Sequence, residues 1–176
     1  MNPFSFFKKI FKGEEHKEEV DLLQIPLEKL KKGDIIELEG ESWEVVDIAL
    51  YDYGVSKEKE WEIRSAENRG FLSLEEGKIY FFSEIDPESI QPNPQEHYRK
   101  YKNPPEEITV GGKKFKLKYA GKAKYVKNLE SYPVIIWEFK NEDGEMIDIE
   151  IWDEYEVEAF KGRQLKEWEI ESILPR

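Results

Sequence analysis

Two short stretches decide the fold of this sequence, Gly40-Glu-Ser-Trp43-Glu-Val45 and Gly112-Lys-Lys-Phe115-Lys-Leu117. In both, a glycine that permits a turn precedes side chains that alternate between a large apolar group and a charged one. Alternation with a period of two is typical of a β-strand with one buried face. The shared pattern indicates that one strand-rich unit occurs twice in the chain.

Four further matches follow in the same order and together predict an internal repeat. They are Tyr53 with Tyr125, Trp61-Glu62-Ile63 with Trp137-Glu138-Phe139, Phe71–Glu75 with Met146–Glu150, and Ser89–Pro92 with Ser172–Pro175. Loops of different length would explain why the separation drifts along the chain. We therefore expect a mostly β fold in which two repeated strand-rich modules, each a small barrel or a curved sheet, pack as one unit.

The repeat also divides the chain into segments. We assign residues 1–25 to an amphipathic helix and an acidic linker, 26–92 to the first module, 93–105 to a proline-containing connection, and 106–176 to the second module. Within the second module we expect Phe115, Leu117 and Tyr119 to share one strand face, opposite a row of lysines. Residues 161–163 are predicted to form a tight hairpin turn.

The composition narrows the classes of function. The chain has 176 residues, a net charge of −12, no cysteine, and 14% aromatic residues, so large rings carry much of its core. The lack of cysteine removes disulfides, thiolate nucleophiles and sulfur-based zinc sites. His16 and His97 fall in predicted linkers, so no catalytic triad follows. Carboxylates are abundant and leave a paired-carboxylate enzyme or a calcium site open, but no pair stands out. We expect no catalytic residues, no metal site and no cofactor.

The first twelve residues have the pattern of an amphipathic helix. Five apolar side chains fall on one side of a helical wheel, and Ser5 and three lysines fall on the other. This pattern is typical of a helix that lies on an anionic membrane surface. Packing against this fold, a protein partner and a disordered tail are the alternatives. The expected membrane-contacting residues are Phe4, Phe6, Phe7, Lys8, Lys9, Ile10, Phe11 and Lys12.

Charge is segregated along the chain. Residues 113–127 contain seven lysines and no acid, whereas the segments on either side are acidic. One reading is a patch for nucleic acid or anionic lipid. The other is a solvated strand face that is neutralised by nearby acids such as Glu37, Glu39 or Glu150. We favour the second reading and expect no nucleic-acid partner, because the rest of the surface would repel phosphate.

Aromatic residues next to acids form a candidate cation site. Rings and carboxylates together can hold organic cations, polyamines included. The ordinary alternative is that these rings belong to the core and the acids to the surface. The candidate residues are Tyr51, Asp52, Tyr53, Glu60, Trp61 and Trp152.

The glycine and aromatic landmarks of both copies resemble the bacterial family "domain of unknown function 4178". The residues that carry this resemblance are Gly40, Trp43, Tyr53, Trp61-Glu62-Ile63 and Gly70–Gly77, and in the second copy Trp137-Glu138, Ile149–Trp152 and Glu156–Gly162. The resemblance implies no known activity, and it places related genes near those for envelope-stress and polyamine-synthesis proteins.

From these features we expect a cytoplasmic, non-enzymatic interaction module. Its N-terminal helix would attach it to the inner membrane surface or to a protein partner. The alternative is a soluble binding protein for a cationic small molecule such as a polyamine.

Overall fold

The computed structural model describes residues 27–176, so the predicted N-terminal helix lies outside the described residues. The described chain is mostly β-strand and contains one twelve-stranded antiparallel sheet and one short α-helix, which confirms the predicted mostly β class. No helix within residues 27–176 is long and apolar enough to cross a membrane.

The elements follow one another in two similar runs. The first run contains the 3₁₀ turn η2 (Leu27–Lys29), β1 (Ile35–Leu38), β2 (Glu41–Asp52), β3 (Lys57–Arg64), β4 (Arg69–Glu75), β5 (Lys78–Ile85), η3 (Pro87–Ser89) and β6 (Ile90–Gln91). The second contains α1 (Pro94–Tyr101), β7 (Glu107–Val110), β8 (Lys113–Lys127), β9 (Glu130–Lys140), β10 (Glu145–Ile151), β11 (Val157–Leu165), η4 (Glu167–Glu169) and β12 (Ile170–Leu174).

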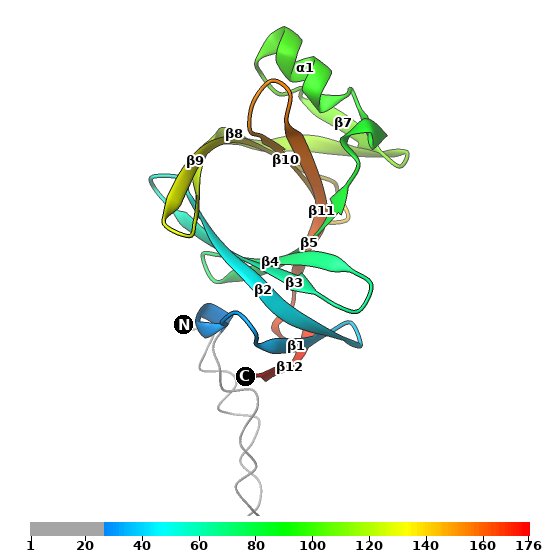
Figure 1. The fold of residues 1–176 in the computed structure, drawn as a ribbon. Coiled ribbons are helices and arrows are strands. Elements are labelled where there is room, and N and C mark those ends of the chain that lie inside the picture. The colour runs from blue at the N-terminus through cyan, green and yellow to red at the C-terminus, as the bar shows by residue number, and fades with distance from the viewer. Residues whose placement is uncertain (1–26) are drawn as a thin grey trace, which may run out of the picture.

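The sheet closes on itself. Its strand order is β12-β1-β2-β3-β4-β5-β11-β10-β9-β8-β7-β6, and β2 pairs in addition with β8. In that extra pairing Tyr51 lies opposite Tyr125, and on the far side of the ring Phe82 in β5 lies opposite Gly162 in β11. The eight strands from β2 to β8 therefore form a closed barrel, and Figure 1 looks along its interior.

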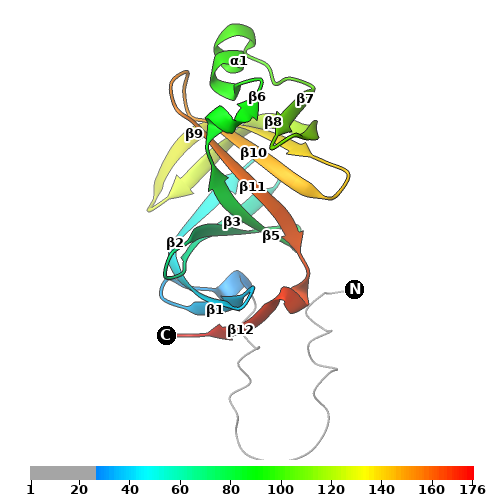
Figure 2. The same ribbon diagram turned by 90° about the vertical axis from the view of Figure 1, so that its right-hand side faces the viewer.

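Two apolar cores lie outside the barrel interior, on the other face of its strands. The first core packs β1 and β12 against β2, β3 and β4 and contains Trp43 and Trp61. The second packs β6 and β7 against β8, β9 and β10 and contains Phe115 and Trp137. Each core is completed by a strand from the other run, since β12 pairs with β1 and β6 pairs with β7. Figure 2 shows β12 crossing beneath the barrel to reach β1.

Alternation along single strands separates the two environments. In β3, Trp61 and Ile63 belong to the first core, whereas Glu58, Glu60 and Glu62 line cavities inside the barrel. In β10 the isoleucines 147, 149 and 151 belong to the second core, whereas the acids 148 and 150 line the interior. Successive side chains of a strand point to opposite faces, so a sequence of alternating acids and large apolar groups gives a polar interior and an apolar exterior.

The structure adds one element that was not predicted and contradicts two local predictions. Residues 93–105 contain α1, which begins at Pro94 with the Asn93 side chain accepting a hydrogen bond from the Glu96 N–H at 3.0 Å. Residues 161–163 do not form a turn; they lie within β11. Tyr119 does not share a face with Phe115, because a register shift between Leu117 and Tyr119 turns it toward the barrel interior.

Gly162 lies at a close approach between two barrel strands. A Cβ atom at this position would lie 2.2 Å from Cδ1 of Phe82 and 2.6 Å from the carbonyl oxygen of Phe81. Both distances are far shorter than van der Waals contact. The glycine that resembled a turn signal is therefore required by the packing of β11 against β5.

Candidate functional site

The barrel interior contains two cavities, one toward each end. The larger has a volume of about 280 Å³ and the smaller about 170 Å³. A third space of about 20 Å³ lies between them and shares lining residues with both. The interior is thus a nearly continuous space along the barrel rather than a filled core.

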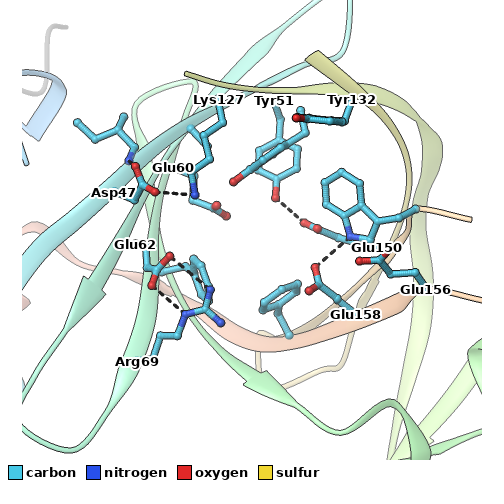
Figure 3. Close-up of a pocket in the computed structure, with 16 residues that line it drawn as sticks. Asp47, Tyr51, Glu60, Glu62, Arg69, Lys127, Tyr132, Glu150, Glu156 and Glu158 are labelled. Carbon is cyan, nitrogen blue, oxygen red and sulfur yellow. Dashed lines mark hydrogen bonds and ion pairs between the residues drawn. The ribbon is translucent and has the colours of Figure 1, made fainter. Parts of the chain in front are cut away.

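Aromatic rings and hydrogen-bonded acids form one wall of the larger cavity (Figure 3). The Tyr51 hydroxyl donates to Oε1 of Glu150 at 2.7 Å, and Nε1 of Trp152 donates to Oε2 of Glu158 at 3.0 Å. The Tyr125 ring makes edge contacts with Tyr51 and Trp152, at centroid distances of 5.1 and 5.3 Å. These contacts hold the rings and two carboxylates in fixed positions around the space.

The Glu60 carboxylate points into the same cavity from β3 (Figure 3). It forms no ion pair among the described residues. Burial raises its pKa well above the ordinary value, and the negative charge of Glu150 adds to this effect. Burial likewise raises the pKa of Glu150 to about 8, against the opposing effect of the Tyr51 hydrogen bond. Two carboxyl groups therefore share an enclosed space in which full ionisation of both is unfavourable.

The smaller cavity has a second acidic group. The Tyr53 hydroxyl donates to Oε2 of Glu58 at 2.9 Å, and the Ser73 hydroxyl donates to the other oxygen of Glu58. Oδ1 of Asp148 is fully enclosed and has no hydrogen-bond partner among the described residues. Burial raises the pKa of Asp148, and the charges of Glu138 and Glu58 raise it further. A buried acceptor without a donor is uncommon and calls for an explanation.

Basic groups do not compensate these acids. Arg69 and Lys127 line the larger cavity, but Arg69 is bonded to Glu62 at 2.9 Å and to Glu84 at 3.1 Å, and Lys127 to Asp47 at 2.6 Å. No lysine, arginine or histidine lines the smaller cavity within residues 27–176. The interior therefore carries excess negative charge when its inner carboxyl groups ionise.

The structure brings together four of the six residues proposed as a cation site. Tyr51, Glu60 and Trp152 line the larger cavity, and Tyr53 lines the smaller one. Asp52 lies apart from both cavities, where its carboxylate accepts from the Gly54 N–H at 2.8 Å and faces Lys57 at 4.0 Å.

Trp61 also lies apart from the cavities. It is buried in the first core, and its Nε1 donates to the carbonyl oxygen of Leu30 at 3.2 Å. The predicted membrane-contacting residues 4–12 lie outside the described residues.

Sequence reasoning missed Glu58, Tyr125, Asp148 and Glu150. The signal was present in the acid–isoleucine alternation of Asp148-Ile149-Glu150-Ile151, which indicates a strand with one acidic face. What the sequence does not reveal is that the acidic faces of β3 and β10 meet, because that depends on barrel closure.

The lysine-rich strand β8 is only partly neutralised. Lys113 pairs with Glu145 at 2.8 Å and Lys114 with Glu107 at 2.9 Å. None of the expected partners is used: Glu37 accepts from Ser42, Glu39 pairs with Arg163, and Glu150 accepts from Tyr51. Four lysines of β8 are exposed and form no ion pair within the described part of the chain, namely 116, 118, 122 and 124.

Comparison with known proteins gives a family. The family model described as "Domain of unknown function (DUF4178)" matches residues 31–167, which include every strand of the barrel. The chain belongs to the DUF4178 family. A protein of Aquifex aeolicus (strain VF5), named "Uncharacterized protein", is 74% identical over 169 residues, which cover 96% of each chain. No solved structure matches this DUF4178 chain.

Within the described residues, no group of three or more His, Cys, Asp or Glu side chains is arranged to hold a metal ion.

Proposed function

We propose that the protein is a non-enzymatic binding protein for a cationic organic small molecule, which it holds inside the barrel. The observation that carries this proposal is the uncompensated pair Glu60 and Glu150 in a cavity walled by Tyr51, Tyr125 and Trp152. An organic cation would supply the missing positive charge, and aromatic rings attract such cations through their negative faces.

Electrostatics explains why the site selects a cation. Without a ligand, both carboxylates lose hydration and lie near other acids, and burial together with this like charge raises the pKa of each. A bound ammonium group would stabilise the ionised form of both. Anions, phosphate esters included, would meet only additional repulsion. Polyamines are cations of suitable size and charge, and we take them as the leading ligand class.

Isothermal titration calorimetry with spermidine tests the proposal. We expect binding to the wild-type protein at pH 7.5, and a loss of affinity of about tenfold or more in Glu60→Gln, which removes one charge from a desolvated contact. Glu171→Gln is the matched control, because Glu171 is an exposed carboxylate of β12, outside the barrel. Absence of heat with the wild-type protein at millimolar spermidine would end the proposal.

The two runs of strands are proposed to be copies of one module. Both long hairpin strands have a register shift at the same place after the turn, between Val45 and Asp47 in β2 and between Leu117 and Tyr119 in β8. Bulges are specific features, so a shared position supports common descent. In both runs, a 3₁₀ turn follows the fifth strand of the run and precedes the short strand that crosses over.

Register corrects the match of Phe71–Glu75 with Met146–Glu150 by two residues. Trp61 lies opposite Leu72, and Trp137 lies opposite Ile149, so Leu72 corresponds to Ile149 and Phe71 to Asp148. Glu60 likewise corresponds to Ile136. Glu62 and Glu138 correspond to each other and both line the cavities, but the four acids 58, 60, 148 and 150 have no acidic counterpart in the other copy. Duplication of a common core would not account for them, which supports a role that arose for the assembled barrel.

Attachment to a membrane through residues 1–12 is a separate proposal that rests on the sequence. The apolar and basic sides of that segment predict adsorption to anionic liposomes, with a body of opposite charge held away from the surface. We expect the full-length protein to float with anionic liposomes. A deletion of residues 1–12 and Phe7→Glu should remain in solution. Equal flotation of the deletion and the full-length protein would show that this segment is not the anchor.

A further inference from the structure

We infer that the ligand is a linear oligoamine that places one ammonium group between Glu60 and Glu150 and another between Glu58 and Asp148. This inference rests on the function proposed above and adds the length of the ligand and the spacing of its charges. It also assigns the smaller cavity as a second binding position.

The two acidic positions belong to one continuous space. The small space between the cavities is lined by all four carboxylates, and through them it adjoins the larger cavity on one side and the smaller on the other. Glu58 and Glu60 are two residues apart on β3, and Asp148 and Glu150 are two residues apart on β10. The acids therefore form two successive levels along the barrel.

The spacing of these levels fits an alkylamine chain. Two residues of an antiparallel strand rise by about 6.8 Å, at roughly 3.4 Å per residue. Three or four methylene groups between two nitrogens span about 5 to 6 Å when extended, given bonds of roughly 1.5 Å. Neighbouring ammonium groups of such a chain can therefore each face one level of carboxylates.

The lining between the levels fits the methylene segments. The same small space is lined by four apolar side chains, Phe71, Phe82, Ile136 and Phe160. Carboxylates and apolar groups thus line the same space, and an oligoamine would present charged nitrogens to the former and methylenes to the latter. A compact cation would contact only one part of this lining.

Asp148 indicates which kind of nitrogen group the ligand carries. Its Oδ1 is enclosed and lacks a partner among the described residues, and an N–H donor of the ligand would satisfy the ionised carboxylate. Primary and secondary ammonium groups carry N–H donors, whereas a quaternary ammonium has none. A choline-like ligand in the smaller cavity would therefore leave Oδ1 of Asp148 without a donor.

Both ends of the space reach the surface. Val55, which is 98% exposed, contributes to the lining of the smaller cavity, and Tyr132, which is 46% exposed, contributes to that of the larger one. A linear molecule can therefore enter along the barrel and extend through both levels without burying its two ends completely.

Calorimetry with a series of amines tests the inference. We use butylamine, 1,4-diaminobutane and spermidine, which carry one, two and three nitrogens. We expect affinity to rise by about tenfold or more from butylamine to the diamine, as the second level of carboxylates is occupied, and spermidine to bind at least as tightly as the diamine. Glu58→Gln and Asp148→Asn should lower the affinity for spermidine by a similar factor and leave the affinity for butylamine unchanged. Glu60→Gln should lower the affinity for both spermidine and butylamine, and Glu171→Gln should change neither affinity.

The outcomes separate the inference from the proposed function. If no amine binds, the cation-binding function itself fails. If the three amines bind with equal affinity, or if Glu58→Gln and Asp148→Asn bind spermidine as tightly as the wild-type protein, the single-site function stands and the two-level ligand is wrong. These variants remove buried negative charge, so circular dichroism should show folded proteins with melting temperatures at or above that of the wild type.

Discussion

Single residues show how one strand serves two environments. Trp61 and Glu60 are adjacent in the sequence, yet the indole is 1% exposed in the first core and the carboxylate lines the barrel interior. Trp137 is also 1% exposed, in the second core. The two tryptophans are the largest fully buried side chains among the described residues, and each anchors one core.

Truncating either tryptophan should therefore destabilise the protein strongly. We expect Trp61→Ala and Trp137→Ala each to lower the free energy of unfolding by about 3–5 kcal/mol, measured by urea denaturation, because each leaves a large cavity. Trp168→Ala is the matched control, since that indole is 72% exposed and its loss should change the free energy by less than about 0.5 kcal/mol. Equal midpoints for all three variants would contradict the assignment of the cores.

Glu150 predicts how stability depends on pH. Its pKa is raised from 4.5 to about 8, so between these values the unfolded chain loses a proton that the folded chain keeps. The free energy of unfolding of the ligand-free protein should therefore fall as pH rises from about 4.5 to about 8. For a shift of this size the decrease is on the order of 3–5 kcal/mol.

Glu150→Gln should flatten this pH dependence and raise stability at pH 8, in denaturation series run at several pH values. Glu171→Gln provides the comparison at an exposed site. Stability that rises with pH across this range in the wild-type protein, or a slope that Glu150→Gln leaves unchanged, would contradict the buried, uncompensated state of this carboxyl group.

At the scale of elements, β11 depends on one glycine. Gly162 faces Phe82 across the β5–β11 pairing and has no room for a methyl group. Gly162→Ala should lower the free energy of unfolding by roughly 1–3 kcal/mol, because the added carbon forces Phe82 or the backbone of β5 to move. Thermal unfolding measures the effect, and Gln164→Ala, at an exposed position of the same strand, is the control. Unchanged stability in Gly162→Ala would show that the two strands are less closely packed.

The same element shows what sequence could predict. Alternation correctly placed Trp43 and Phe115 on buried faces of β2 and β8, because a period of two is a local property. The same rule, applied to residues 58–63, would have separated Glu60 from Trp61, which we had grouped in one site. It could not have shown the bulge beside Tyr119, since a bulge depends on the partner strand β9.

The helix α1 was missed for a different reason. Pro94 was read as part of a linker, although a proline that directly follows Asn93 is also a common helix start. The sequence also could not show which candidate site residues lie close together in the fold. Glu60 and Glu150 are far apart in the chain and meet because β2 pairs with β8, a contact between two runs of strands that no local pattern encodes.

At the scale of the whole molecule, the crossed strands couple the two cores. Ile173 in β12 completes the first core, although it lies at the far end of the chain. We expect Ile173→Ala to lower the free energy of unfolding by about 2–4 kcal/mol. Amide hydrogen exchange should show an equal loss of protection in β3 and β9, because both cores share one closed sheet. A loss confined to β1, β2 and β3 would show that the cores unfold separately.

The crossing of β12 also affects how the protein emerges from the ribosome. Residues 27–92 are synthesised before the second run, but their core lacks Ile170 and Ile173 until β12 has been made. By contrast, β6, which pairs with β7 of the second run, is synthesised before the strands of that run. The C-terminal half can thus reach its complete set of partners before the N-terminal half does, which reverses the usual order of vectorial folding. In chains that end before residue 170, protease should cut β1, which then lacks its partner β12, more readily than β7, whose partner β6 is already present.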